Sequence, residues 1–180
     1  EEKHWYNNGL ARNNWAVNLE FYYKILFLAQ QHTNILFFIK SKNHVWLKNS
    51  YFKDLIRLLN KQKNIKILKN SKKWTSDYSI KFADFAIAQS SSLSDKMLYQ
   101  NKPIIIFNLY GWPGETLMYS KKLLIRNLDQ VNKKILLIKK NYMKYNKSLH
   151  EVRQKLFYYK SKPEIIKKTL TFFDDKLTSL

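Results

Sequence analysis

The chain has 180 residues, of which 45% are hydrophobic and 16% aromatic, enough to build the core of one ordinary domain. It contains no cysteine, which excludes disulfide bonds, thiolate metal sites and cysteine nucleophiles. The formal net charge of +20 favours anionic ligands. Because lysine and asparagine are spread along the whole chain, we attribute most of this charge to composition, and nucleic acid is not the expected partner.

The first part of the chain predicts alternating helices and strands. Apolar residues at helical spacing indicate amphipathic helices, and short apolar runs indicate buried strands. In order, we predict a loop over 1–14, a helix over 15–31, a buried strand over 34–39, a helix over 50–60 capped by Asn49 or Ser50, a strand over 65–68 and a short helix over 76–82.

The segment from Ala83 to Phe107 predicts a β-turn-α-β unit. A short apolar run over 85–88 precedes three consecutive serines at 90–92, and a helix then leads to Pro103 and a β-branched strand over 104–107. A helix that begins at the carboxyl end of a parallel strand points unpaired N–H groups at whatever lies there, and phosphate is a common ligand. A serine run after a strand is also the ordinary form of a helix cap.

The later elements are less regular. Asn108–Glu115 contains two of the three glycines and Pro113, and predicts a loop at the carboxyl end of a strand, where open α/β sheets place ligands. An extended segment over 120–126, a helix over 129–139 and a terminal helix over 164–177 follow. We therefore predict one Rossmann-like domain over 1–180, with a parallel sheet, helices on both faces, and a helical C-terminal extension over 140–180.

Several of these residues together resemble a known family. The letters FFIKSK, IKIL and ADFAIAQSSSLSDKMLYQNKPIIIF, between Asn34 and Gly111, are similar to the C-terminal, donor-binding half of GT-B glycosyltransferases. The likeness is to enzymes of capsule and surface-polysaccharide synthesis and to CDP-glycerol glycerophosphotransferases. Its landmarks are Ala83-Asp84 before a strand, the serine turn, and Lys102-Pro103 before the next strand.

The resemblance implies transfer of a sugar or glycerol phosphate from a nucleotide-activated donor substrate, without a metal or cofactor. Serine hydroxyls, helix N–H groups and nearby cations would stabilise the charge of the diphosphate leaving group. The predicted diphosphate-binding residues are Ser90, Ser91, Ser92, Leu93, Lys40, Lys42 and Arg12. The predicted residues for the sugar or base of the donor substrate are Asp95, Trp74, Tyr110, Gly111, Trp112 and Glu115.

The chain departs from the family pattern at three places. Many relatives carry a glutamate where this chain has Lys96, and the nearest carboxylate is Asp95, about 100° away around a helix. A His-Pro pair is replaced by Lys40-Ser41-Lys42, and a glycine-rich loop is reduced to Asn8-Gly9. The sequence identifies no catalytic base, and we expect the acceptor domain to be separate or missing from this chain.

Two other functions stay open at this point. A nucleic-acid-binding module would use the charge and aromatic residues such as Trp74 and Tyr142. A membrane-docking domain would use the alternation of lysine with Tyr, Leu and Phe over 139–168. Since no stretch of 18 apolar residues occurs, we expect a cytoplasmic protein, with peripheral contact to the anionic inner face of the membrane.

Overall fold

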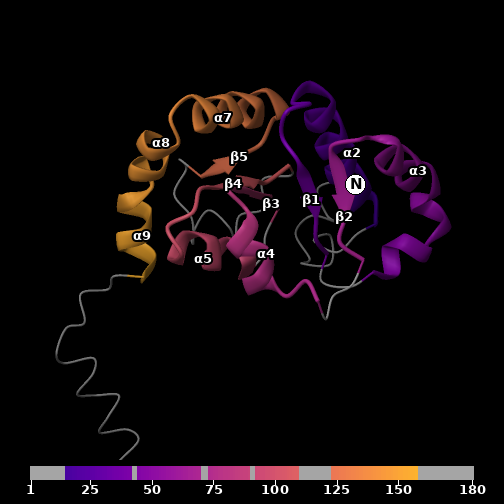
Figure 1. Ribbon diagram of the computed structural model, residues 1–180, viewed down its shortest axis with the longest axis horizontal. Helices are drawn as coiled ribbons and strands as arrows, with labels where there is room; N and C mark the ends of the chain where they lie inside the picture. The colour runs from indigo at the N-terminus through magenta and orange to yellow at the C-terminus, as the bar shows by residue number, and fades with distance from the viewer. Residues whose placement is uncertain (1–14, 42–43, 70–72, 90–91, 110–122, 158–180) are drawn as a thin grey trace, which may run out of the picture.

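Figure 1 shows the computed structural model, which describes residues 15–41, 44–69, 73–89, 92–109 and 123–157. The helices are α2 (Trp15–Gln31), α3 (Lys53–Lys61), α4 (Ser76–Phe82), α5 (Ser92–Tyr99), α7 (Leu128–Lys140), α8 (Tyr142–Ser148) and α9 (His150–Phe157), with short 3-10 helices η2 (Val45–Lys48) and η3 (Ser50–Phe52). The strands are β1 (Phe37–Ile39), β2 (Ile65–Ile67), β3 (Ala86–Ala88), β4 (Ile104–Phe107) and β5 (Leu124–Ile125).

The strands form two small parallel sheets. In the first, β1 pairs with β2 so that Phe37 lies opposite Ile65. In the second, β4 lies between β3 and β5, with Ala86 opposite Ile104 and Ile106 opposite Leu124. The predicted parallel α/β class is confirmed. The four strands that the sequence places in a single sheet are instead divided, because no hydrogen-bonded ladder joins β1 to β3 in the described residues.

Helices cover both sheets. Figure 1 shows α7 on one side of β3–β5 and α4 and α5 on the other, and all four residues of β4 are fully buried between these layers. Helix α3 packs on β2. Helix α2 contacts both sheets: its Phe21 ring lies 6.1 Å from the ring of Phe107 in β4, and its Ala29 carbonyl accepts a hydrogen bond from Asn64, directly before β2. It therefore spans the division between the sheets.

The element bounds follow local capping. The helix predicted over 50–60 begins as η3 and continues as α3, and the Asn49 side chain accepts a hydrogen bond from the Tyr51 N–H at its start. Helices α8 and α9 agree with the expected helical extension as far as residue 157. The loop predicted over 1–14 and the helix predicted over 164–177 lie outside the described residues.

Strand β1 starts three residues later than predicted because a turn follows α2. The Ile35 N–H donates to the His32 carbonyl, which closes the turn. The Asn64 side-chain amide approaches three carbonyl oxygens at 2.9–3.0 Å, those of Ala29, His32 and Ile35. The Asn64 side chain, directly before β2, thus holds the end of α2 and the turn that leads into β1.

We predict that Asn64→Ala lowers the free energy of unfolding by about 2 kcal/mol, because carbonyl groups of α2 and its turn lose their donor. Urea denaturation followed by circular dichroism measures this value. Asn60→Ala is the control, since Asn60 is exposed on α3, and it should change stability by less than about 0.5 kcal/mol. Equal stability of the Asn64 variant and the parent would show that the turn does not need this amide.

Candidate functional site

A cleft of about 890 Å³ lies between β1 and β3, and we call it the β1–β3 cleft. Residues of both strands line it, together with Asn18, Tyr22 and Ile25 of α2 and residues of α4. If the two sheets were one, the strand order would be 2-1-3-4-5, a doubly wound order that reverses direction between β1 and β3. The carboxyl end of the cleft therefore lies where doubly wound folds bind ligands.

Strand ends bring polar groups to one end of this cleft. Lys40 directly follows β1, and α5 begins at Ser92, four residues after the end of β3. Lys40 and Leu93, in the first turn of α5, both line the cleft. The amino end of a helix carries a partial positive charge. This end of the cleft is therefore suited to an anion.

The structure brings some of the predicted site residues together in one cleft. Lys40, Leu93 and Trp74 line the same cleft, whereas Asp95 lies in the first turn of α5 and is not among the lining residues. Ser92 is the first residue of α5. The remaining predicted residues lie outside the described residues: Arg12, Lys42, Ser90, Ser91, Tyr110, Gly111, Trp112 and Glu115.

Lys96, which stands where the resemblance implies a glutamate, contacts α4. The Lys96 Nζ lies 2.9 Å from Asp77 Oδ1, and this pair links α5 to α4 on the surface. Both side chains are about half exposed or more, so the pair contributes little to stability. Lys96 is thus directed to α4, and the structure gives it no place on the cleft.

The sequence did not predict two polar residues near the carboxyl end of the cleft. Asn18 and Gln89 both line it, and the Gln89 amide donates to the Val17 carbonyl of α2 at 3.5 Å. Gln89 directly precedes the serine run, which is a signal that sequence reasoning could have used. Asn18 lies within an otherwise apolar stretch of α2, and only the packing of α2 over the cleft identifies it.

Other polar side chains line the amino end of the cleft. Asp84, Lys139 and Tyr142 line it there, and the Lys139 Nζ donates to Asn34 Oδ1 at 2.9 Å. Burial and the nearby Asp84 carboxylate raise the pKa of Tyr142 above its ordinary value. The Asp84 carboxylate distinguishes this end from the end at Lys40, where no carboxylate of the described residues lines the cleft.

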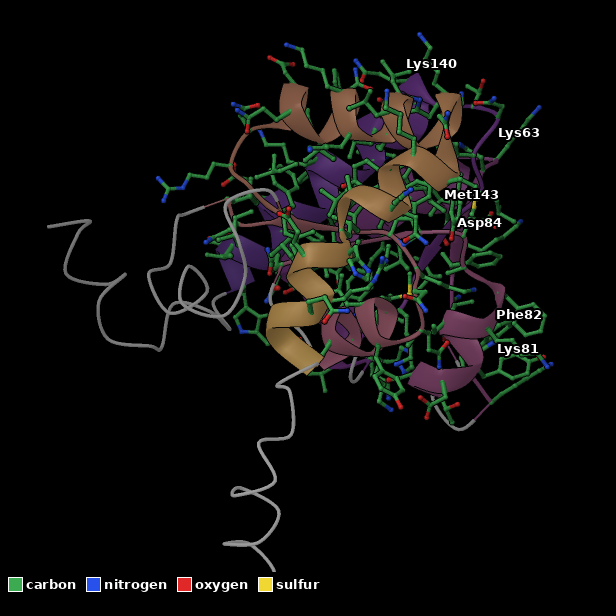
Figure 2. All side chains as sticks on the ribbon, turned by 90° about the vertical axis from the view of Figure 1, so that its left-hand side faces the viewer. Lys63, Lys81, Phe82, Asp84, Lys140 and Met143 are labelled. Atoms are coloured by element: carbon green, nitrogen blue, oxygen red, sulfur yellow. The ribbon has the colours of Figure 1, made fainter. Side chains whose placement is uncertain are left out.

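Four aromatic side chains form a continuous strip along the α4 side of the cleft. Neighbouring ring centroids lie 6.3 Å apart for Phe38 and Trp74, 5.2 Å for Trp74 and Tyr78, and 4.8 Å for Tyr78 and Phe82. Phe38, Tyr78 and Phe82 are 41–56% exposed. Figure 2 shows Lys81, Phe82 and Asp84 along the same edge of the molecule in that view. The strip offers flat apolar faces to a base or sugar ring.

The described residues limit the chemistry of the site. They contain no group of three or more His, Asp or Glu side chains placed to hold a metal ion. Tyr22 lines the cleft, and burial raises its pKa to about 12, so its hydroxyl stays neutral at physiological pH. The cleft thus offers cations, amides, helix N–H groups and aromatic faces.

Among the described helices, none has the length and apolar character needed to cross a bilayer.

Comparisons of the chain with protein-family models, with curated proteins and with solved structures found no significant match.

Proposed function

We propose that this domain binds the diphosphate of a nucleotide-activated donor substrate at the carboxyl end of the β1–β3 cleft. In this role it is the donor-binding half of a GT-B glycosyltransferase that transfers a sugar or glycerol phosphate in surface-polysaccharide synthesis. The reaction class rests on the resemblance of the segment between Asn34 and Gly111, and the binding site rests on the geometry of the cleft.

One observation supports the binding site most directly. Lys40 at the end of β1 and Leu93 in the first turn of α5 line one cleft, although 53 positions separate them in the sequence (93 − 40 = 53). Parallel topology brings the carboxyl ends of strands to one edge of a sheet. A diphosphate placed there would meet the Lys40 ammonium and the positive amino end of α5 together.

The remaining groups suit the rest of a nucleotide. Trp74 belongs to the aromatic strip, between Phe38 and Tyr78, so a base or sugar ring at the cleft would pack on its face. Asn18 and Gln89 carry amides that donate to or accept from ribose or sugar hydroxyls. When the bond to the diphosphate breaks, Lys40 and the helix N–H groups would stabilise the negative charge on the leaving group.

We place the catalytic base and the acceptor site in another domain. Asp84 is the carboxylate that lines the cleft in the described residues, and it lies at the amino end, away from Lys40. A base must lie within hydrogen-bond reach of the acceptor hydroxyl that it deprotonates. We therefore propose that a separate acceptor domain faces the carboxyl end of the cleft and supplies this base.

Saturation-transfer NMR with UDP-glucose, CDP-glycerol and GDP-mannose tests this proposal. At least one of these ligands should bind, and Lys40→Ala should weaken that binding by about tenfold, since a hydrogen bond to a charged group contributes about 1.5 kcal/mol or more. Lys63→Ala is the matched control, because Lys63 is an exposed cation at the opposite, amino end of β2 (Figure 2). Equal losses in both variants would indicate nonspecific charge attraction, and absence of binding by all three ligands contradicts the proposal.

A further inference from the structure

The facing edges of the two sheets carry backbone groups that point into the cleft. In β1, the Phe37 N–H donates to the Asn64 carbonyl and the Ile39 carbonyl accepts from the Leu68 N–H, so both residues use their backbone groups toward β2. In β3, the Ala86 N–H donates to the Pro103 carbonyl on the side of β4. Successive residues of a strand direct these groups to opposite sides. The N–H and C=O of Phe38 and Ile87 therefore face each other across the cleft.

The two edges also point in the same direction. Only five residues connect the end of α2 to the start of β1, so the two elements run antiparallel, and the first turn of α2 lies at the carboxyl end of β1. The Gln89 amide, just after β3, donates to Val17 in the first turns of α2. The carboxyl ends of β1 and β3 therefore lie at the same end of α2, which makes a parallel pairing of the two strands feasible.

Contacts near the amino ends of the strands link the two sheets through α7. Near the amino ends, Lys139 of α7 donates to Asn34 before β1, and His32 bonds with Asn132 of α7. Between the strands the cleft wall is mainly apolar, with Ile25, Ile39 and Ile87 among its residues. Bringing β1 and β3 together would remove this apolar surface from water and pair the free backbone groups.

From these observations we infer that β1 and β3 pair directly in a second, closed state, which joins the two sheets into one five-stranded parallel sheet of order 2-1-3-4-5. The described state is then the open one. Parallel pairing limits which residues can lie opposite each other in the closed state. Phe38 directs its backbone groups toward β3, so the residue opposite it must direct its own backbone groups toward β4. That residue is Ala86 or Ala88. Ile87 consequently falls opposite Phe37 or Ile39, and never opposite Phe38.

Closure is coupled to the ligand at the carboxyl end, and this coupling rests on the proposed function. Lys40 continues directly from β1 and Leu93 belongs to the helix that follows β3, so an anion held by both draws the two strand ends together. Such a ligand binds the closed state more tightly than the open state and shifts the population toward it. The crevice beyond the strand ends stays open for the ligand, because closure takes place between the strands.

Cysteine pairs test the closed state, and the absence of native cysteine makes the result unambiguous. Partners in parallel strands lie about 5 Å apart, within the range that a disulfide spans. Oxidation should cross-link Ile39→Cys/Ile87→Cys or Phe37→Cys/Ile87→Cys, and the pair that reacts identifies the register. Phe38→Cys/Ile87→Cys is the matched control, because its side chains would lie on opposite faces of the closed sheet. Cross-linking of the control as fast as of the other two pairs overturns the inference.

Hydrogen exchange of the unmodified chain gives an independent readout. The Phe38 and Ile87 amides should exchange at least tenfold more slowly with saturating UDP-glucose, CDP-glycerol or GDP-mannose, whichever binds. Measured binding without this slowing overturns the coupled closure and leaves the proposed function intact. If none of the three ligands binds, the proposed function fails, and the cysteine pairs alone decide whether the closed state exists: selective cross-linking supports it and its absence overturns it.

Discussion

Replacing Arg153 with alanine is expected to lower the free energy of unfolding by about 3 kcal/mol, a larger loss than the one expected for Asn64→Ala. Arg153 of α9 is only 5% exposed. Its guanidinium donates to the Leu98 carbonyl at 3.0 Å, to the Asn146 carbonyl at 2.8 Å and to the Asn146 side-chain oxygen. It therefore joins the end of α5, the end of α8 and α9.

The expected loss has two causes. The Leu98 carbonyl belongs to the last turn of α5, where carbonyl groups lack helical partners and the helix carries a partial negative charge. The buried Arg153 cation donates to this carbonyl and offsets the partial negative charge of the helix end. Burial lowers the pKa of Arg153 below its ordinary value. The Leu98 and Asn146 carbonyls keep the Asn101 and Leu149 N–H groups as donors, but removing the guanidinium breaks its own hydrogen bonds to them and opens a cavity beside Leu98. Since α5 also forms one wall of the β1–β3 cleft, its position depends on this contact.

Urea denaturation at constant pH measures the Arg153 effect. Arg153→Lys keeps the charge but lacks the fork that reaches several carbonyls at once, so it should recover less than half of the loss. Arg57→Ala is the control, because Arg57 pairs with Asp54 on the surface, and both side chains are at least 65% exposed. That variant should lose less than about 0.5 kcal/mol. Similar losses for Arg57→Ala and Arg153→Ala would show that the burial of Arg153 adds nothing.

Sequence periodicity predicted the elements well because each depends on local signals. The helix over Trp15–Gln31 and the short helix over Ser76–Phe82 agree with the predicted bounds. The division of the sheet could not be predicted in this way, since an apolar run shows that a strand is buried but not which strand pairs with its edge. The run over 34–39 illustrates the limit: Leu36 and Phe38 are about half exposed, although the run predicts burial, and Phe38 belongs to the aromatic strip.

Part of the cleft was predictable from the alternation of strands and helices. Lys40 and the first turn of α5 line one cleft because each follows a parallel strand, and the sequence predicted those strands and that helix. The aromatic strip was not predictable as a unit, since Phe38 comes from β1 and its neighbours from the region of α4. Contacts between distant segments of this kind depend on packing that no local pattern records.

Replacing Ser91 and Ser92 together with alanine should weaken binding of the nucleotide-activated donor substrate by one to two orders of magnitude. Ser92 begins α5, and both hydroxyls belong to the serine run that the sequence places after β3. A hydrogen bond to a charged phosphate contributes about 1.5–3 kcal/mol, so the loss of two bonds accounts for at least this change. The helix N–H groups remain, and the fold should therefore persist with a residual affinity for phosphate.

Titration calorimetry with the donor substrate that binds most tightly measures this loss, and the thermal midpoint reports on the fold. Ser94→Ala is the matched control on the same helix: Ser94 is fully buried, and its hydroxyl has no hydrogen-bond partner among the described residues. Its replacement should leave the affinity unchanged and, by removing an unpaired buried hydroxyl, keep or raise the stability. A folded Ser91/Ser92 variant that binds as tightly as the parent would show that the diphosphate does not contact these two hydroxyls, because hydroxyls in contact with phosphate cannot be removed without a loss of affinity.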